Sequence, residues 1–251
     1  MIQTLDHGDV RELRLDRPPA NALSPELIAT LRDAVESAPG AGARALVLSG
    51  SPGMFSGGLD VPYLITLDRP AILDTWRDFY CLLRSLAASP IPIAAAITGH
   101  SPAGGAVLAI FCDSRIMAEG DFKIGLNEVQ VGIPMPPAIY QGLRRLVGLR
   151  QAERLCVGGQ LFSPAEALRL GLVDELAPLE RVVERAVEWC RSLLTLPPGA
   201  MAGTRRLVRS GLASYFAEGN EEELAGLVDQ WFSDETQGAL RGLVERLKKK
   251  G

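Results

Sequence analysis

Two glycine-rich turns hold the backbone groups in this sequence that could do chemistry. The first runs from Met54 to Asp60, and the second runs from Pro102 to Val107. Each follows an apolar run typical of a buried strand and leads toward a helix. Glycine allows positive φ and close approach of a ligand, and the first N–H groups of a helix have no partner within it. Two such groups converging from different strands can hold a developing oxyanion, although tight packing alone also explains turns of this kind.

Histidine is scarce, which limits the other chemistry open to the chain. His7 and His100 are its two histidines, so a catalytic triad or a histidine-rich metal site has almost no material, and a general base is expected to be a carboxylate. Neither turn matches the G-x-x-x-x-G-K-[ST] or G-x-G-x-x-G pattern of nucleotide loops. The stretch from Gly99 to Ala103 ends in alanine and has a proline after its serine, which disfavours a serine hydrolase.

The composition is that of a globular protein with a real core. Hydrophobic residues make up 47% of the chain and charged residues 22%, and the net charge of −4 implies no basic face for nucleic acid. No C-x-x-C pair occurs, so neither a zinc site nor a disulfide framework is indicated, and we expect buried free thiols at all four cysteines. We find no signal peptide, no apolar run long enough for a bilayer and no C-terminal Ser-Lys-Leu. These features predict a cytoplasmic protein without a membrane partner.

Strand and helix alternate through the first half of the sequence and must position the two turns. Ser24 is expected to cap a helix that begins at Pro25 and ends near Pro39. The other predicted elements are strands at 10–15, 45–48, 91–98 and 114–118 and helices at 70–88 and 106–111. This alternation predicts an α/β fold with crossover connections.

Helical periodicity dominates the second half. The predicted helices are 139–147, 151–157, 164–170, 179–194, 200–216 and 221–249. No Ser/Gly-rich linker separates the halves. We therefore divide the chain into an α/β core at 1–190 and a C-terminal helical region at 191–251, which packs on the core or on a neighbouring subunit.

Four stretches of the sequence match known sequence motifs. RPPANAL at 17–23 resembles R-P-x-x-N-A-L, and FSGGLD at 55–60 resembles F-[SA]-[AG]-G-x-D. GHSPAGGAVLAIFCD at 99–113 resembles G-x-x-x-G-G-G-x-x-L-A-x-x-C-D, and FKIGLNEVQVGI at 122–133 resembles F-x-x-[GP]-E-x-x-x-G. In their order and spacing these motifs resemble those of the enoyl-CoA hydratase/isomerase (crotonase) superfamily, and the likeness covers nearly the whole chain.

The resemblance implies a fold, a ligand and an assembly. The fold would be a spiral of ββα units with a C-terminal helical trimerisation region, and the assembly a homotrimer or a dimer of trimers. The substrate would be an acyl-CoA, with coenzyme A as part of the substrate and with no separate cofactor and no metal. The N–H groups of Leu59 and Gly104 would hold the thioester oxygen as it becomes an enolate. The substrate-binding residues implied are Ala20, Ala22, Ser56, Gly57, Gly58, Leu59, Asp60, Val61, Gly104, Val107 and Asn127.

The reaction is indicated by one carboxylate that matches the family and by another that is replaced. Hydratases of this family hold a water between two glutamates; one matches Glu128, and the other would fall at Val107. Valine cannot orient or deprotonate water, so hydration is disfavoured. The segments 101–105 and 124–128 resemble those of Δ3,Δ2-enoyl-CoA isomerases, in which one base moves a proton from C2 to C4. Asn127 would lie beside the substrate. Apolar neighbours such as Val129, Val131 and Ile133 would raise the pKa of the base.

Other interpretations stay open at the level of sequence. Glu128 alone is also consistent with a solvated loop residue. The same oxyanion hole would serve another acyl-CoA hydratase, a hydrolase or a lyase, and a third alternative is an acyl-CoA-binding protein without turnover. We interpret Asp60 as a hydrogen-bonding support rather than a base, and His100, Asp113 and Arg115 as structural.

Overall fold

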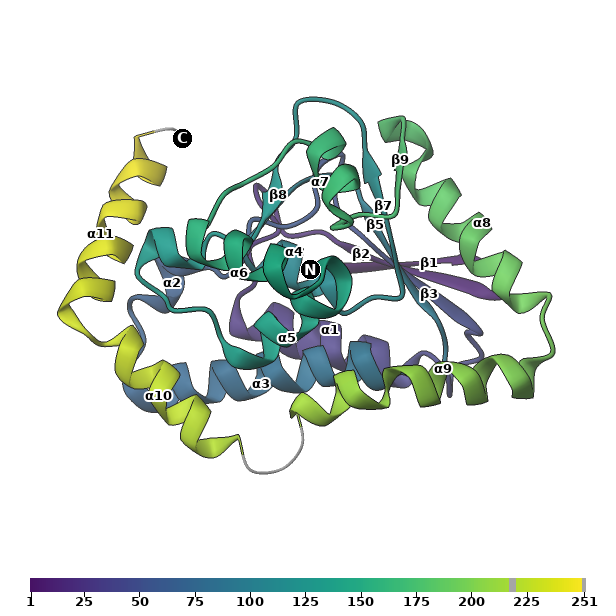
Figure 1. Cartoon of the computed structure of the whole chain (residues 1–251), viewed down its shortest axis with the longest axis horizontal. Helices are drawn as coiled ribbons and strands as arrows, with labels where there is room; N and C mark the ends of the chain where they lie inside the picture. Colours follow the sequence, from purple (N-terminus) through teal and green to yellow (C-terminus); the bar gives the residue numbers. More distant parts are fainter. Residues whose placement is uncertain (217–219, 250–251) are drawn as a thin grey trace.

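The computed structural model of the protein describes residues 1–216 and 220–249, and its main sheet has the strand order β1-β2-β3-β5-β7-β9 (Figure 1). These strands are β1 (Ile2–His7), β2 (Val10–Leu15), β3 (Ala45–Ser49), β5 (Ile93–Ile97), β7 (Ser114–Ala118) and β9 (Glu175–Ala177). β1 and β2 form an antiparallel hairpin, and every later neighbour pairs in parallel. The hairpin partner β1 was not predicted, because it is half exposed and short of apolar residues.

A second, smaller sheet has the order β4-β6-β8. Its strands are β4 (Gly53–Met54), β6 (Gly99–Pro102) and β8 (Ile124–Gly125). They pair in parallel, with Gly53 opposite Gly99 and Pro102 opposite Gly125. None of the three short strands was predicted, because strands of two to four residues carry no readable alternation.

Successive ββα units build a spiral within an α/β fold, as the family resemblance implies. β3 and β4 lead to α2 (Val61–Leu64) and α3 (Arg69–Ala88). β5 and β6 lead to α4 (Gly104–Ile110). β7 and β8 lead to the 3₁₀ turn η1 (Glu128–Val131) and then to α5 (Pro137–Val147). In each unit the longer strand joins the main sheet and the shorter strand joins the small sheet.

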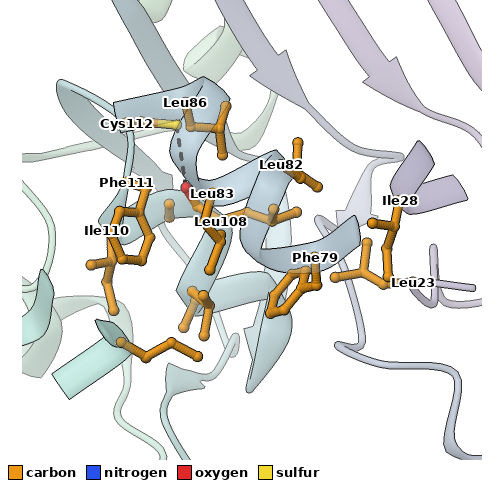
Figure 2. Close-up of a cluster of buried hydrophobic side chains, with 14 of the residues drawn as sticks. Leu23, Ile28, Phe79, Leu82, Leu83, Leu86, Leu108, Ile110, Phe111 and Cys112 are labelled. Carbon is orange, nitrogen blue, oxygen red and sulfur yellow. Dashed lines mark hydrogen bonds between the residues drawn. The ribbon is translucent and has the colours of Figure 1, made fainter. Parts of the chain in front are cut away.

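The central strands β3, β5 and β7 of the main sheet are buried on both faces, as the apolar character of β3 and β5 predicted. In β3, Leu46 and Leu48 face one core and Ala45 and Val47 face the other, because strand side chains alternate. The first core packs the sheet against α1 (Pro25–Ser37), α3 and α4, and Figure 2 shows Ile28, Phe79 and Leu108 meeting in it. The second core lies under α8 (Val182–Leu194).

Local signals were reliable where a side chain caps a helix. Ser24 accepts the Leu27 N–H at 3.2 Å and starts α1, as predicted.

The prediction of four buried thiols was wrong for Cys81, which is exposed on α3. That position shares the solvent face of the helix with Asp74 and Arg84, at helical spacing.

The C-terminal half is helical, with one break that the sequence analysis missed. Its elements are α6 (Leu149–Gly158), α7 (Pro164–Leu170), η2 (Leu179–Arg181), α9 (Pro198–Ala213), η3 (Ser214–Phe216), α10 (Glu221–Trp231) and α11 (Asp234–Lys248). A single helix over 221–249 was predicted, whereas Ser233 is extended and caps α11 by accepting the Thr236 N–H. The serine followed by two acidic residues is a start signal that could have located this break.

Helices α10 and α11 fold back over the core (Figure 1). α10 lies along α3, where Arg69 pairs with Asp229 at 2.6 Å and Arg77 pairs with Glu221 at 2.6 Å. The division at residue 190 falls inside α8, which packs on the main sheet along its length up to Cys190. Of the predicted helical region 191–251, residues 217–219 and 250–251 lie outside the described residues.

Replacing Gly226 with Ala is expected to stabilise the protein by about 1 kcal/mol. Gly226 lies within α10, and a Cβ placed there meets no atom within 4 Å. Alanine lowers the entropy of the unfolded chain without a steric cost. Chemical denaturation of both proteins measures the change, and a variant less stable than the wild type would contradict it.

Candidate active site

Three residues that the sequence analysis singled out occupy equivalent places in three successive units of the spiral. Leu59 follows β4, Gly104 follows β6, and Glu128 follows β8. Because the three short strands pair side by side and in parallel, the segments after them leave the sheet at the same edge. The Ala103 N–H donates to the Gly125 carbonyl at 2.9 Å, which ties the start of α4 to the segment before Glu128.

The Leu59 N–H is directed by the bridge that Leu59 makes with Leu23. In this parallel bridge the Leu23 N–H donates to the Gly58 carbonyl at 2.8 Å, and the Asp60 N–H donates to the Leu23 carbonyl at 3.1 Å. The Leu59 N–H lies between these two groups along the strand and therefore points to the opposite side. Among the hydrogen bonds of the described residues, none uses this N–H as donor.

Gly104 brings a second free donor beside the first. A Cβ placed on Gly104 would lie 3.3 Å from the Leu59 nitrogen, and a Cβ placed on Gly58, at φ +86°, would lie 3.1 Å from the Gly104 nitrogen. Gly104 is the first residue of α4, and its N–H makes no hydrogen bond within the described chain. Ala103, directly before Gly104, has φ 46° and ψ −122°. This conformation is unfavourable for alanine and sets the direction of the backbone where α4 begins. The two donors predicted to form an oxyanion hole are thus adjacent.

Asn21 fixes the loop that carries the first donor, and sequence reasoning gave this residue no role. Its side-chain amide donates to the carbonyls of Met54 and Phe55, both at 3.1 Å, and its Oδ1 accepts the Arg17 N–H at 2.8 Å. The Ser56 hydroxyl donates to the Asn21 carbonyl at 2.8 Å. Asn21 has φ 47°, a left-handed conformation that asparagine tolerates better than most residues. Its place inside the RPPANAL motif was the available signal.

Asp60 supports this loop, in agreement with its predicted role. Its Oδ1 accepts the Tyr63 N–H at 3.3 Å and caps α2, and its Oδ2 accepts a bond from Arg17 Nη2 at 2.6 Å. Both oxygens are therefore occupied. Neither carboxylate oxygen of Asp60 is free to act as a base.

Replacing Asp60 with Ala is expected to lower the free energy of unfolding by about 1–2 kcal/mol, because a helix cap and an ion-pair partner are lost. Turnover is expected to stay within about tenfold of the wild type, since the backbone N–H groups are retained. Asp60→Asn, which keeps the capping oxygen, serves as the matched control. A turnover as low as that of a Glu128 variant would show that Asp60 takes part in the chemistry.

Glu128 is the buried carboxylate of the site. It opens η1 and is 8% exposed, and its Oε2 has no hydrogen-bond partner among the described residues. Burial raises the pKa of Glu128 to about 7, because the charged form loses its hydration. A pKa near 7 suits a group that takes and returns a proton at neutral pH. The alternative of a solvated loop glutamate is therefore wrong.

The surroundings of Glu128 differ in part from the prediction. Ile133 is buried, but Val129 is exposed, because the 3₁₀ turn directs consecutive residues to different sides. Cys156 of α6 lies close enough for electrostatic interaction, an arrangement that the sequence did not indicate. Burial and, secondly, the Glu128 carboxylate raise the pKa of Cys156 to about 11, so this neighbour is a neutral thiol.

The remaining predicted residues line or support the two loops. Val107 is buried, one helical turn after Gly104, and its N–H donates to the Ala103 carbonyl. The Asn127 Oδ1 is buried without a partner among the described residues, next to Glu128 in the chain. Ala20 accepts the Gly57 N–H at 2.7 Å, and the Ala22 carbonyl accepts a bond from Arg17 at 3.0 Å. Val61 is buried at the start of α2.

A small apolar cavity adjoins the side chain of Leu59. Its volume is about 10 Å³, room for one water at most. It is lined by Leu59, Leu64, Ile72, Thr75, Trp76, Phe79 and Trp231. Trp231 comes from α10 and was not predicted as a neighbour of the site, because nothing in the sequence signals where that helix folds back.

Two features are absent from residues 1–216 and 220–249. Within these ranges no cluster of three or more His, Cys, Asp or Glu side chains could hold a metal ion. In the same part of the chain, no helix has both the length and the apolar character needed to cross a bilayer.

Comparison with known proteins adds independent findings. The family model "Enoyl-CoA hydratase/isomerase" matches residues 6–250. The mitochondrial enoyl-CoA delta isomerase 1 of Mus musculus is 32% identical over 253 residues, covering 100% of this chain and 88% of the mouse protein. A probable enoyl-CoA hydratase of Mycobacterium avium is 33% identical over 85% of this chain and 81% of its own length. The crystal structure of human mitochondrial delta3-delta2-enoyl-CoA isomerase superposes with a TM-score of 0.94 at 32% identity, covering 99% of this chain and 98% of that one.

Proposed function

The chain belongs to the enoyl-CoA hydratase/isomerase family, and from this membership we propose that it is an isomerase, which moves the double bond of a 3-enoyl-CoA to the 2-position. The observation that carries the proposal is the pairing of one buried carboxylate with one aliphatic residue. Glu128 is present, and Val107 occupies the position of the second glutamate of hydratases. The buried valine cannot hold a nucleophilic water, whereas a proton shift needs only one base.

The proposed reaction has two proton transfers at one carboxylate. Glu128 removes a proton from C2 of the 3-enoyl thioester, and the electron pair of that C–H bond moves toward the carbonyl as the enolate forms. The N–H groups of Leu59 and Gly104 donate to the enolate oxygen. Glu128 then gives the proton to C4, which binds it with the electron pair of the C3–C4 double bond. The enolate restores its carbonyl, and the double bond that forms between C2 and C3 is conjugated with the thioester. No water is consumed and no redox change occurs.

The electrostatics of the site support this assignment. A carboxylate whose pKa lies near 7 is a stronger base than an ordinary glutamate and is still largely ionised above neutral pH. Its surroundings exclude water, which strengthens the hydrogen bonds to the enolate and disfavours the competing addition of water. The named relatives include both isomerases and a probable hydratase, so Val107 is what favours isomerisation over hydration.

The test uses the purified protein with a panel of 3-enoyl-CoA and 2-enoyl-CoA thioesters of increasing chain length. We expect conjugated 2-enoyl-CoA from the first set, little 3-hydroxyacyl-CoA from the second, and no free CoA. If 3-hydroxyacyl-CoA were the main product, the protein would be a hydratase. Release of free CoA would indicate a hydrolase. A carbon–carbon cleavage product would indicate a lyase. Tight binding without any product would favour a non-catalytic acyl-CoA-binding protein.

The proposal includes the assembly and the cellular setting. The acyl-CoA is the ligand, without a separate cofactor, a nucleic-acid partner or a membrane partner, and the location is the cytoplasm. A homotrimer or a dimer of trimers is supported by Leu207 and Val208, two large apolar side chains of α9 that are 74% and 53% exposed. Sedimentation velocity is expected to show a trimer or hexamer, and a monomer would contradict the assembly. Fractionation of the source cells tests the location.

A further inference from the structure

The turn that carries Glu128 is held from outside the spiral by α11. The Thr236 hydroxyl donates to the Gly132 carbonyl at 2.5 Å, and Thr236 is fully buried. Gly132 closes η1 at φ +75°, and its N–H donates back to the Glu128 and Val129 carbonyls. A Cβ placed on Gly132 would lie 3.0 Å from the Thr236 Cα, so the two backbones are in close contact. One hydroxyl thus holds Gly132, the residue directly after η1, and the proposed base Glu128 is the first residue of η1.

The hydroxyl itself is held by the corner between α10 and α11. Gln230 Nε2 donates to the Thr236 Oγ1 at 3.2 Å, and the Thr236 N–H donates to the Ser233 Oγ at 3.2 Å. The Gln237 side chain donates to the Trp231 carbonyl at 2.8 Å and closes the corner. These bonds fix the direction in which the hydroxyl donates.

Glu128 depends on this outside support because few hydrogen bonds hold its own side chain in place. Its Oε2 makes no hydrogen bond with the described residues, so the direction of the carboxylate follows from the backbone of η1. The other fixed point of the turn is Gln130, which donates to the Gly159 carbonyl at 2.7 Å. Thr236 therefore completes a two-sided clamp on the turn, with α6 on one side and α11 on the other.

We propose that Thr236 is a positioning residue for the base, acting through the Gly132 carbonyl to hold the turn in the conformation that aims Glu128 at the substrate. The inference rests on the proposed function. It assigns α11 a part in the chemistry beyond covering the core. Misplacement of a reacting group by about 1 Å is enough to cost about a hundredfold in rate.

The experiment compares Thr236→Val with Thr236→Ser in the 3-enoyl-CoA assay. Valine keeps the shape of threonine and removes the donor, whereas serine keeps the donor. For Thr236→Val we expect kcat to fall by about tenfold to a hundredfold with KM changed by less than about threefold. Thr236→Ser is expected to stay within about threefold of the wild type. A fall in kcat with a nearly unchanged KM distinguishes a misplaced base from a weakened binding site.

A destabilised control separates positioning from general loss of stability. Val187→Ala opens a gap in the separate core under α8, away from the turn, and is expected to lower the melting temperature while kcat is kept. Three results would each overturn the inference. In the first, Thr236→Val keeps the wild-type kcat; in the second, its kcat is no lower than that of Val187→Ala; in the third, Thr236→Ser does not restore the rate. A wild-type protein that isomerises no 3-enoyl-CoA would instead overturn the proposed function.

Discussion

Replacement of Glu128 by Gln is expected to reduce isomerisation by about 10²–10⁴-fold, the usual contribution of a positioned general base. Glutamine has nearly the same shape, so acyl-CoA binding and the fold are expected to be kept. The loss would appear in kcat, and KM would change little. Full activity in this variant would show that Glu128 is not the base and that another residue removes the proton.

The pH dependence of the wild type provides a second measure of the same group. Because the pKa of Glu128 is raised to about 7, kcat/KM is expected to rise tenfold per pH unit below that value and to level off above it. An ordinary glutamate would give a rate that is already flat above about pH 5. The residual rate of Glu128→Gln is expected to lack the rise near pH 7.

The same burial predicts a dependence of stability on pH. The carboxyl titrates near 4.5 in the unfolded chain and near 7 in the folded protein. Between these values the folded state binds more protons than the unfolded state, so the free energy of unfolding falls as the pH rises from about 4.5 to about 7. The loss amounts to at most about 3 kcal/mol, since one pH unit corresponds to about 1.4 kcal/mol.

Glu128→Gln separates this contribution from all others. Glutamine does not ionise, so the variant is expected to gain stability over the wild type as the pH rises, by at most about 3 kcal/mol between pH 4.5 and pH 8. Urea denaturation of both proteins across this range measures the difference. A constant difference at every pH would mean that Glu128 is solvated when folded. An inactive variant that is more stable at pH 8 would show that the base destabilises the folded protein.

Replacement of Gly104 by Ala is expected to lower kcat/KM by about 10²–10³-fold, the usual cost of losing one donor of an oxyanion hole. The new Cβ would lie 3.0 Å from the Leu23 Cδ1 and 3.3 Å from the Leu59 nitrogen. The leucine side chain can move aside, whereas the Leu59 nitrogen and the Gly58 Cα, which would lie 3.2 Å from the new Cβ, are backbone atoms that must shift by a few tenths of an ångström. The methyl group would push the Leu59 and Gly104 donors apart or crowd the oxygen that they hold.

The matched control for this variant is Gly226→Ala, which adds the same methyl group in open space on α10. It is expected to keep the full rate. Binding of a saturated acyl-CoA to Gly104→Ala should weaken much less than kcat/KM falls, because the donors matter most when the oxygen carries charge. A folded Gly104→Ala protein with the rate of the wild type would disprove the assignment of this N–H group to the oxyanion hole.

Much of the fold was readable because its signals are local. The buried strand at 45–48 is apolar at every position, as is the 91–97 part of the strand predicted at 91–98, and Ser24 with Pro25 marks a helix start through its own hydrogen bond. The two glycine turns were also visible in the sequence, because close backbone approach requires particular residue types, whereas Glu128 was singled out by the family resemblance. The family resemblance supplied the order in which these parts are assembled.

Tertiary structure decided what depends on distant parts of the chain. The sequence predicted a raised pKa for Glu128 from its apolar neighbours in the chain, but it did not show that Val129 is exposed or that Cys156 of α6 lies close to the carboxylate. The small sheet is visible only through pairing, because strands of two residues have no periodicity. The sequence by itself determined which groups could act, since residue type and spacing set local conformation. Only the packing of α10 and α11 determined that Thr236 meets Gly132, because a hydrogen bond between residues so far apart depends on how the whole chain folds back.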